Sequence, residues 1–258
     1  MEIDDTRIQT SRGKLYAKQW VPDEADGRAP MVLLHQSLGC VELWGNFPRK
    51  LAQATRRTVL AYDRLGFGQS DPHPGELDLD FIEEEAREGF AAVRKHFGID
   101  HFIAYGHSVG AGMAAACAAT YPDSCDVLIT EAAQATIEQK TIDGVLEARE
   151  MYAEEENVER LRPYHGDKTE WVLHAWIDTW LADEFRDWNL YDVLARVECP
   201  TLVIHGDEDE YGSPEQAASI AQRVDGSAKT LMLDGCGHIP HRERTEEVLR
   251  AAAEFLDS

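Results

Sequence analysis

The chain has 258 residues, enough for one large hydrophobic core in a single domain. It carries 48 acidic side chains against 25 basic ones, and its formal net charge at pH 7 is −23. A field of that sign repels nucleic acids and anionic membrane surfaces, so we expect neither as a partner. The start of the chain is acidic and no apolar run approaches the roughly 20 residues that span a bilayer. We therefore expect a soluble, cytoplasmic protein, either a monomer or a homodimer.

The basic residues comprise 18 arginines and only 7 lysines. Few lysines combined with many carboxylates are typical of salt-adapted surfaces, and a GC-rich genome explains the same composition equally well. The five cysteines are scattered and include no C-x-x-C pair, which argues against a disulfide framework and a structural zinc site. The histidines do not show metal-ligand spacing either. We therefore expect no metal and no cofactor.

Apolar runs predict the strands, which are expected in chain order at 7–10, 15–21, 31–35, 58–63, 101–105, 125–130, 200–204 and 230–233. Amphipathic or small-residue segments predict the helices, at 41–54, 80–97, 111–120, 191–196, 214–224 and 245–256. Strands that alternate with helices are typical of a parallel sheet covered by helices on both faces. The sequence thus predicts an α/β fold with a mostly parallel eight-stranded sheet.

The stretch between the sixth and seventh predicted strands is far longer than a single helical connection requires. It contains two helical patterns, 137–156 and 168–182, and no strand pattern. We predict that residues 133–188 form a helical insertion in a core domain made of residues 1–132 and 189–258.

The segment Gly106-His107-Ser108-Val109-Gly110 stands between the predicted strand at 101–105 and a helix of small residues. A sharp turn from strand to helix would hold the Ser108 hydroxyl exposed on a strained bend. The flanking glycines would let the strand and the helix approach each other closely. Serine alone is a weak nucleophile, so this pattern is informative only when a base and an acid accompany it.

A carboxylate and a histidine follow in a suitable order. Asp209 comes shortly after the strand at 200–204, and His238 comes shortly after the strand at 230–233. Because the carboxyl ends of parallel strands share one edge of a sheet, we expect both side chains to meet Ser108 there. The chain order Ser, Asp, His also differs from the orders found in the two familiar classes of serine protease.

Five loops together resemble the α/β-hydrolase fold family of serine hydrolases, and the resemblance covers nearly the whole chain. In chain order they lie at 35–39, 63–70, 106–110, 206–209 and 235–238. The resemblance implies a catalytic triad of Ser108, Asp209 and His238, and an oxyanion hole formed by the backbone N–H groups of Ser37 and Val109. It also implies a helical cap after the sixth strand. Some family members take the acid from the end of that strand, which leaves Glu131 as an alternative to Asp209.

The chain departs from the family pattern at Gln36. The family usually has glycine directly after the histidine of the oxyanion loop, here His35. Glycine permits a positive φ and a close backbone approach, which glutamine permits less easily. We therefore expect the loop to differ locally from that of its relatives, with the Gln36 side chain facing the site.

The cap is expected to cover the site with aromatic side chains. Trp176 and Trp180 lie one helical turn apart and share a face, which would pack on the core domain and look toward the site. The residues expected to line the substrate pocket are Gln36, Leu38, Trp171, Trp176 and Ile239. Such a lining favours a small to medium, largely apolar acyl or aromatic group as part of a small-molecule substrate.

These features predict a hydrolase that cleaves a carboxylic ester through an acyl-enzyme at Ser108. A lactonase and a C–C bond hydrolase of a dienoate use the same triad and remain alternatives. A dienoate is anionic, so the acidic protein repels it unless an arginine such as Arg64 or Arg162 compensates. Serine at this position disfavours the related dehalogenases and epoxide hydrolases, which have aspartate there. A non-catalytic receptor of the same fold is the least favoured alternative.

Overall fold

The computed structural model describes residues 1–25 and 27–257. Within that part of the chain, eight strands form one sheet in the spatial order β1-β2-β4-β3-β5-β6-β7-β8. The strands are β1 (Glu2–Gln9), β2 (Lys14–Val21), β3 (Met31–Leu34), β4 (Val59–Tyr62), β5 (Phe102–His107), β6 (Cys125–Glu131), β7 (Thr201–Gly206) and β8 (Ala228–Leu233). Only β1 with β2 and β2 with β4 pair in antiparallel fashion among these strands. The predicted mostly parallel eight-stranded sheet is confirmed.

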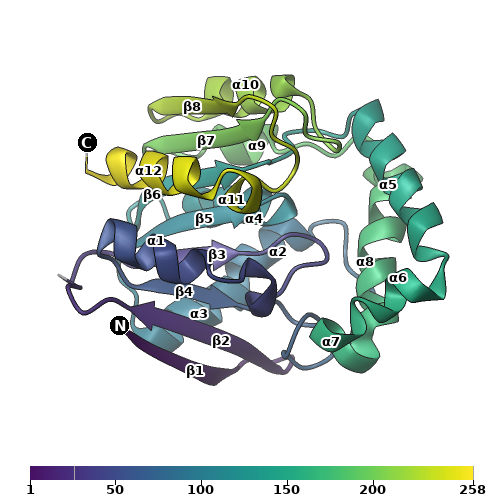
Figure 1. The fold of residues 1–258 in the computed structure, drawn as a ribbon, viewed down its shortest axis with the longest axis horizontal. Helices are drawn as coiled ribbons and strands as arrows, with labels where there is room; N and C mark the ends of the chain where they lie inside the picture. The colour runs from purple at the N-terminus through teal and green to yellow at the C-terminus, as the bar shows by residue number, and fades with distance from the viewer. Residues whose placement is uncertain (26, 258) are drawn as a thin grey trace.

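Helices cover both faces of the sheet (Figure 1). One face carries α1 (Phe47–Thr55), α11 (Pro240–Glu243) and α12 (Thr245–Leu256). The other carries α2 (Phe81–Arg87), α3 (Gly89–Phe97), α4 (Val109–Thr120), α9 (Tyr191–Leu194) and α10 (Pro214–Arg223). In the described part of the chain, no helix combines the length and the apolar character that crossing a bilayer requires.

A hydrophobic core lies on each face of the sheet, and alternating residues of the same strands contribute to the two cores. Met31 and Leu33 of β3 belong to the core that includes α1 and α12, whereas Val32 and Leu34 belong to the core that includes α4. Because successive side chains of a strand point to opposite faces, a strand in the middle of a covered sheet must be apolar throughout. This explains why the central strands appear in the sequence as unbroken apolar runs.

A helical segment separates β6 from β7, and all of its residues are described. It consists of α5 (Gln139–Tyr152), α6 (Glu155–Glu159), α7 (Arg162–His165), α8 (Thr169–Leu181) and the short 3₁₀ turns η2 (Gly166–Lys168) and η3 (Asp183–Phe185). In Figure 1 these helices stand beyond the carboxyl ends of the parallel strands, apart from the two helical layers. A helical insertion after the sixth strand, as predicted, is therefore present. Its limits at 133 and 188 stay a prediction.

Two predicted helices are interrupted in the structure. The helix expected at 41–54 begins as a 3₁₀ turn, η1 (Val41–Trp44), and continues as α1 after Gly45, whose φ of +58° breaks the regular course. The helix expected at 80–97 is divided into α2 and α3 at Glu88, where φ is −111° and ψ is −78°. Both breaks lie next to a glycine, the residue that interrupts a helix most readily apart from proline.

Candidate active site

Ser108 stands on the sharp turn between β5 and α4, in the strained conformation that the sequence predicts. Its φ of +56° and ψ of −127° are values that residues other than glycine rarely adopt. Its backbone N–H donates to the carbonyl of Glu131 at 2.8 Å. A Cβ atom at Gly106 would lie 2.1 Å from the carbonyl oxygen of Gly110, and one at Gly110 would lie 2.2 Å from that of Leu34. The turn therefore requires both glycines.

The structure brings the three predicted triad side chains together. His238 Nε2 lies 3.0 Å from Ser108 Oγ, and His238 Nδ1 lies 2.9 Å from each carboxylate oxygen of Asp209. Ser108 and His238 are 8% and 9% exposed, and Asp209 is fully buried. Asp209 Oδ1 also accepts the backbone N–H groups of Tyr211 and Gly212, at 2.8 and 3.2 Å. These three side chains are thus buried and joined by hydrogen bonds, and main-chain donors hold Asp209 from behind.

These contacts determine the charge of Asp209. Burial acts to raise the pKa of its carboxyl group, but the hydrogen bond and charge of His238 and the Tyr211 N–H outweigh it and leave the pKa below its ordinary value. Asp209 is therefore an ionised acceptor for a proton on His238 Nδ1. In a neutral ring the proton on Nδ1 leaves Nε2 free to accept from the Ser108 hydroxyl. The arrangement has the polarity that a general base requires.

Glu131, the alternative acid, belongs to a separate buried network. Its carboxylate accepts the backbone N–H and the Nδ1–H of His241, at 2.8 and 2.7 Å, and the hydroxyl of Tyr105. Burial acts to raise the pKa of Glu131, and the charge and hydrogen bond of His241 overcome it and lower the pKa to about 2. His107 Nε2 lies 2.7 Å from the carbonyl oxygen of His238. Glu131 is therefore the hydrogen-bond partner of His241, and Asp209 is the partner of His238.

The same network contains a group of side chains that could in principle bind a metal. In the described part of the chain, ligand atoms of His107, Glu131 and His241 all lie within 4.8 Å of one another. However, both carboxylate oxygens of Glu131 already accept hydrogen bonds, and all three side chains are buried. Satisfied acceptors and a closed environment fit a structural hydrogen-bond network better than a metal site.

Ser37 and Val109, the residues predicted to form the oxyanion hole, line the same small space. Ser37 also lines the cavity at Ser108, and Val109 directly follows Ser108 in the chain. Within residues 1–25 and 27–257, the backbone N–H of neither residue has a hydrogen-bond acceptor. For Val109 this follows from its place as the first residue of α4, where helical N–H groups point outward without partners. Free N–H groups next to a nucleophile are what the stabilisation of an oxyanion requires.

Gln36 takes part in the turn at residues 36–39 without the positive φ that glycine would permit. Its φ is not positive. Its carbonyl accepts the N–H of Gly39 at 2.9 Å, which closes a four-residue turn, and its side-chain Oε1 accepts the N–H of Leu38 at 2.9 Å. The Gln36 side chain lines the cavity at Ser108, the position predicted for it.

A cavity of about 200 Å³ opens above Ser108. From the predicted pocket, the residues that line it are Gln36, Leu38, Trp176 and Ile239. Trp171 does not line it, which corrects the prediction. Its ring packs on Phe67 and His73, and its Nε1–H donates to the carbonyl of Gly75 at 2.8 Å. Trp171 precedes Trp176 by five residues, and that spacing places the two side chains on different faces of α8.

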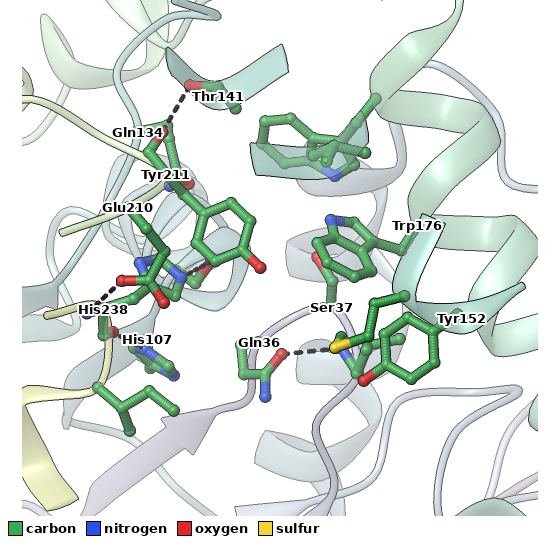
Figure 2. Close-up of a pocket in the computed structure, with 16 residues that line it drawn as sticks. Gln36, Ser37, His107, Gln134, Thr141, Tyr152, Trp176, Glu210, Tyr211 and His238 are labelled. Carbon is green, nitrogen blue, oxygen red and sulfur yellow. Dashed lines mark hydrogen bonds between the residues drawn. The ribbon is translucent and has the colours of Figure 1, made fainter. Parts of the chain in front are cut away.

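Part of the lining comes from α5 and from the loops after β6 and β7, and the sequence did not predict it. These residues are Gln134, Thr141, Val145, Met151, Tyr152, Glu210 and Tyr211. Figure 2 shows the rings of Tyr211 and Trp176 next to each other, and they meet edge to face with their centroids 6.0 Å apart. Glu210 accepts the backbone N–H of His238 at 3.2 Å. The only sequence feature that pointed to Glu210 was its position directly after Asp209.

The chain belongs to the alpha/beta hydrolase fold family, whose model matches residues 29–176. It is 24% identical to a proline iminopeptidase of Lactobacillus helveticus, over 100% of this chain and 99% of that protein. Among solved structures, 2-hydroxy-6-oxo-6-phenylhexa-2,4-dienoate hydrolase from Rhodococcus sp. strain RHA1 has a TM-score of 0.84 at 18% identity, over 100% of this chain and 99% of that one. A thermophilic esterase from Thermogutta terrifontis has a TM-score of 0.76 at 22% identity, over 98% of each chain. The predicted family and fold are confirmed.

Proposed function

We propose that this α/β-hydrolase cleaves a carboxylic ester of a small to medium, largely apolar substrate through an acyl-enzyme at Ser108. The observation that carries the proposal is the continuous line of hydrogen bonds from Ser108 through His238 to Asp209 at the base of a cavity. A strained, glycine-flanked turn that presents the nucleophile gives independent support, because strain at a single residue is typical of functional sites.

In the proposed reaction, Ser108 Oγ attacks the ester carbonyl carbon while His238 Nε2 accepts the hydroxyl proton. The carbonyl oxygen becomes an oxyanion, which the N–H groups of Ser37 and Val109 hold. The intermediate collapses, the C–O bond to the alcohol breaks, and His238 returns the proton to the leaving alcohol. Water then attacks the acyl-enzyme with His238 as the base, and the acid product and free Ser108 result.

The lining of the cavity supports an apolar acyl group. Its apolar members come from both the core and the helical segment, and they are Leu38, Val145, Met151, Trp176, Trp180 and Ile239. A cavity of about 200 Å³ holds a group of a few carbon atoms to an aromatic ring, with the remainder of a longer substrate outside. The size and polarity therefore favour short and medium acyl chains.

The charges around the cavity favour a neutral substrate over a dienoate. Among the residues that line it, Glu210 is the one acidic side chain, and none is a lysine or an arginine. Arg162 is partly exposed and pairs with Glu155, Glu159 and Glu170, and it does not line the cavity. Arg64 is committed to the carbonyl of Gln36 at 3.1 Å. A lactone is as neutral as an ester, so lactone hydrolysis is the second candidate.

The test is a substrate panel of p-nitrophenyl esters from acetate to dodecanoate, beside one lactone and one dienoate. We expect the highest kcat/KM for a short or medium ester and loss of turnover in Ser108→Ala. A matched control is Ser219→Ala on α10, remote from the cavity, which should retain full activity. Faster cleavage of the dienoate than of any ester would reassign the reaction. A wild type that turns over no substrate and takes no fluorophosphonate would favour the receptor.

A further inference from the structure

We propose that Arg64 and His35 are positioning residues that aim and strengthen the Ser37 N–H of the oxyanion hole by holding the carbonyl of Gln36. The inference rests on the proposed function, because it assigns a role within that reaction. Gln36 C=O and Ser37 N–H belong to one planar trans peptide unit, so they point in opposite directions. Any contact that fixes the carbonyl therefore also fixes the N–H.

The carbonyl oxygen of Gln36 accepts three hydrogen bonds. The N–H of Gly39 donates at 2.9 Å and closes the turn. His35 Nδ1 lies at 2.8 Å and Arg64 Nη2 at 3.1 Å. Closure of a four-residue turn requires only the first of these bonds. The other two come from side chains that reach the carbonyl from outside the turn, and they restrict its rotation further.

The backbone of Arg64 determines which nitrogen of His35 carries the proton. The Arg64 N–H donates to His35 Nε2 at 3.1 Å, so Nε2 is an acceptor and the proton lies on Nδ1, opposite Gln36. Burial and the nearby Arg64 charge keep the pKa of His35 well below its usual value. His35 therefore stays neutral at physiological pH and keeps this tautomer.

The guanidinium of Arg64 is unusual because it donates its hydrogen bond to a carbonyl oxygen, that of Gln36, and not to a carboxylate. Arg64 is 4% exposed, and its guanidinium lies 4.0 Å from the centroid of the Phe67 ring. In the described part of the chain, no carboxylate oxygen lies within 4.0 Å of its nitrogens. The carboxylates of Glu85 and Asp63 favour the charged form of Arg64 from beyond that distance. A buried charge without a contacting carboxylate is still costly, so its retention here calls for a further reason.

Electrostatics supply that reason. A positive charge bonded to the Gln36 oxygen polarises the amide, and a polarised amide is a stronger donor through its N–H. The same arginine lines the small space that Ser37 and Val109 share. Arg64 thus lies on the carbonyl side of the Gln36–Ser37 peptide unit, opposite the N–H that would hold the oxyanion, and it does not line the cavity at Ser108. Such preorganised charge acts on the transition state more than on the ground state.

The test compares Arg64→Ala and Arg64→Lys with Arg94→Ala as a matched control. The guanidinium of Arg94 likewise lies over an aromatic ring, 4.4 Å from the Tyr121 centroid, and donates to a carbonyl, that of Asp100 at 3.0 Å. It does so away from the cavity. The readouts are kcat and KM for the best ester, the inhibition constant of an alkylboronic acid, and the melting temperature. A boronate bound to the Ser108 oxygen carries a tetrahedral oxyanion, so its affinity reports on the oxyanion hole.

We expect Arg64→Ala to lower kcat about 10- to 100-fold, with KM changed less than about threefold and the boronate weakened by the same factor as kcat. Arg64→Lys retains the charge, so its kcat and boronate affinity should lie between those of the wild type and Arg64→Ala. Added guanidinium ion should restore part of the kcat of Arg64→Ala and none in the wild type. Arg94→Ala should leave all readouts except the melting temperature within about twofold.

Three results would overturn this role: an unchanged kcat in Arg64→Ala, a kcat loss without a matching boronate loss, or an equal loss in Arg94→Ala. If Arg64→Ala does not fold, Arg64→Gln replaces it, and wild-type kcat and boronate affinity in that variant would refute the role. An active wild type with unaffected Arg64 variants defeats this inference alone. A wild type that hydrolyses no ester and binds no boronate defeats the proposed function and this role with it.

Discussion

Replacing Asp209 with asparagine changes the polarity of the triad while preserving its shape. In the wild type, both carboxylate oxygens lie 2.9 Å from His238 Nδ1, and Oδ1 also accepts the N–H groups of Tyr211 and Gly212. In Asp209→Asn the amide oxygen should occupy the position of Oδ1, because the N–H groups of Tyr211 and Gly212 need an acceptor there and an NH₂ group cannot accept. The NH₂ group then takes the position of Oδ2, 2.9 Å from Nδ1 of His238, where it competes with the amide oxygen at the same distance. A donor at that position favours the tautomer with its proton on Nε2, which cannot accept from Ser108.

The expected loss is about 10⁴-fold in kcat, the size seen when a triad histidine is held in the wrong tautomer. This corresponds to about 5.5 kcal/mol of activation free energy. The binding of substrate should change little, since Asp209 is fully buried and lies behind His238. The assay is steady-state hydrolysis of the best p-nitrophenyl ester, with the rate of fluorophosphonate labelling as a second measure of nucleophile activation.

Glu131→Gln is the matched control, because Glu131 is also fully buried and bonded to a histidine, His241. We expect its kcat to fall less than about tenfold. A loss below about tenfold in Asp209→Asn would refute the assignment of the acid. So would an equal loss in a folded Glu131→Gln.

Other predictions concern stability and specificity. Because the pKa of Glu131 is lowered from its usual 4.5 to about 2, this group stabilises the fold above pH 4.5 and loses that contribution as pH falls toward 2. Acid unfolding of Glu131→Gln should therefore depend less on pH by on the order of 3 kcal/mol across that window, and parallel curves would contradict this. Trp176→Ala should widen the cavity and raise the dodecanoate-to-butanoate ratio of kcat/KM by about tenfold or more, and an unchanged ratio would remove Trp176 from the pocket. Glu210→Gln should raise kcat/KM severalfold for an anionic ester but not for a neutral one, and the gain should shrink in high salt. The unfolding midpoint should rise from low to molar salt, because salt screens the repulsion among the surplus carboxylates. A midpoint that does not rise would contradict this.

The sequence predicted the central strands and the proximity of Ser108, Asp209 and His238 because strong local constraints act there. Strands buried on both faces must be apolar throughout, and the loops at their carboxyl ends must meet at one edge of the sheet. The turn at Ser108 needs glycine on both sides, since a Cβ atom at either position would meet backbone. These constraints act on single residues and short runs, so they are visible without the structure.

The outer strands were predicted less well, for a physical reason. β1 extends back to Glu2 and β8 to Ala228, whereas the apolar patterns began at residues 7 and 230. Both strands lie at an edge of the sheet and most of their side chains are exposed. Hydrophobic periodicity marks only the buried faces, and charged residues on an edge strand protect it from pairing with other chains.

The pocket was the least predictable part, because it depends on how the helical segment packs on the core. Periodicity placed Trp176 and Trp180 on one face of a helix and Trp171 on another, but it could not say which face lines the cavity. Tyr152 and Tyr211 reach the cavity from elements that lie far apart in the sequence. The support of the oxyanion loop by Arg64 was hidden for the same reason, since it depends on a contact between two different loops.

The most direct test of the account is the mass spectrum of the intact protein after incubation with a fluorophosphonate, followed by peptide mapping. We predict one adduct per chain, located on Ser108 and absent from Ser108→Ala. Labelling should be slowed strongly in a variant that removes the imidazole of His238. An adduct on another residue, or rapid labelling of Ser108 without His238, would contradict the proposal that these side chains work together as a nucleophile and its base.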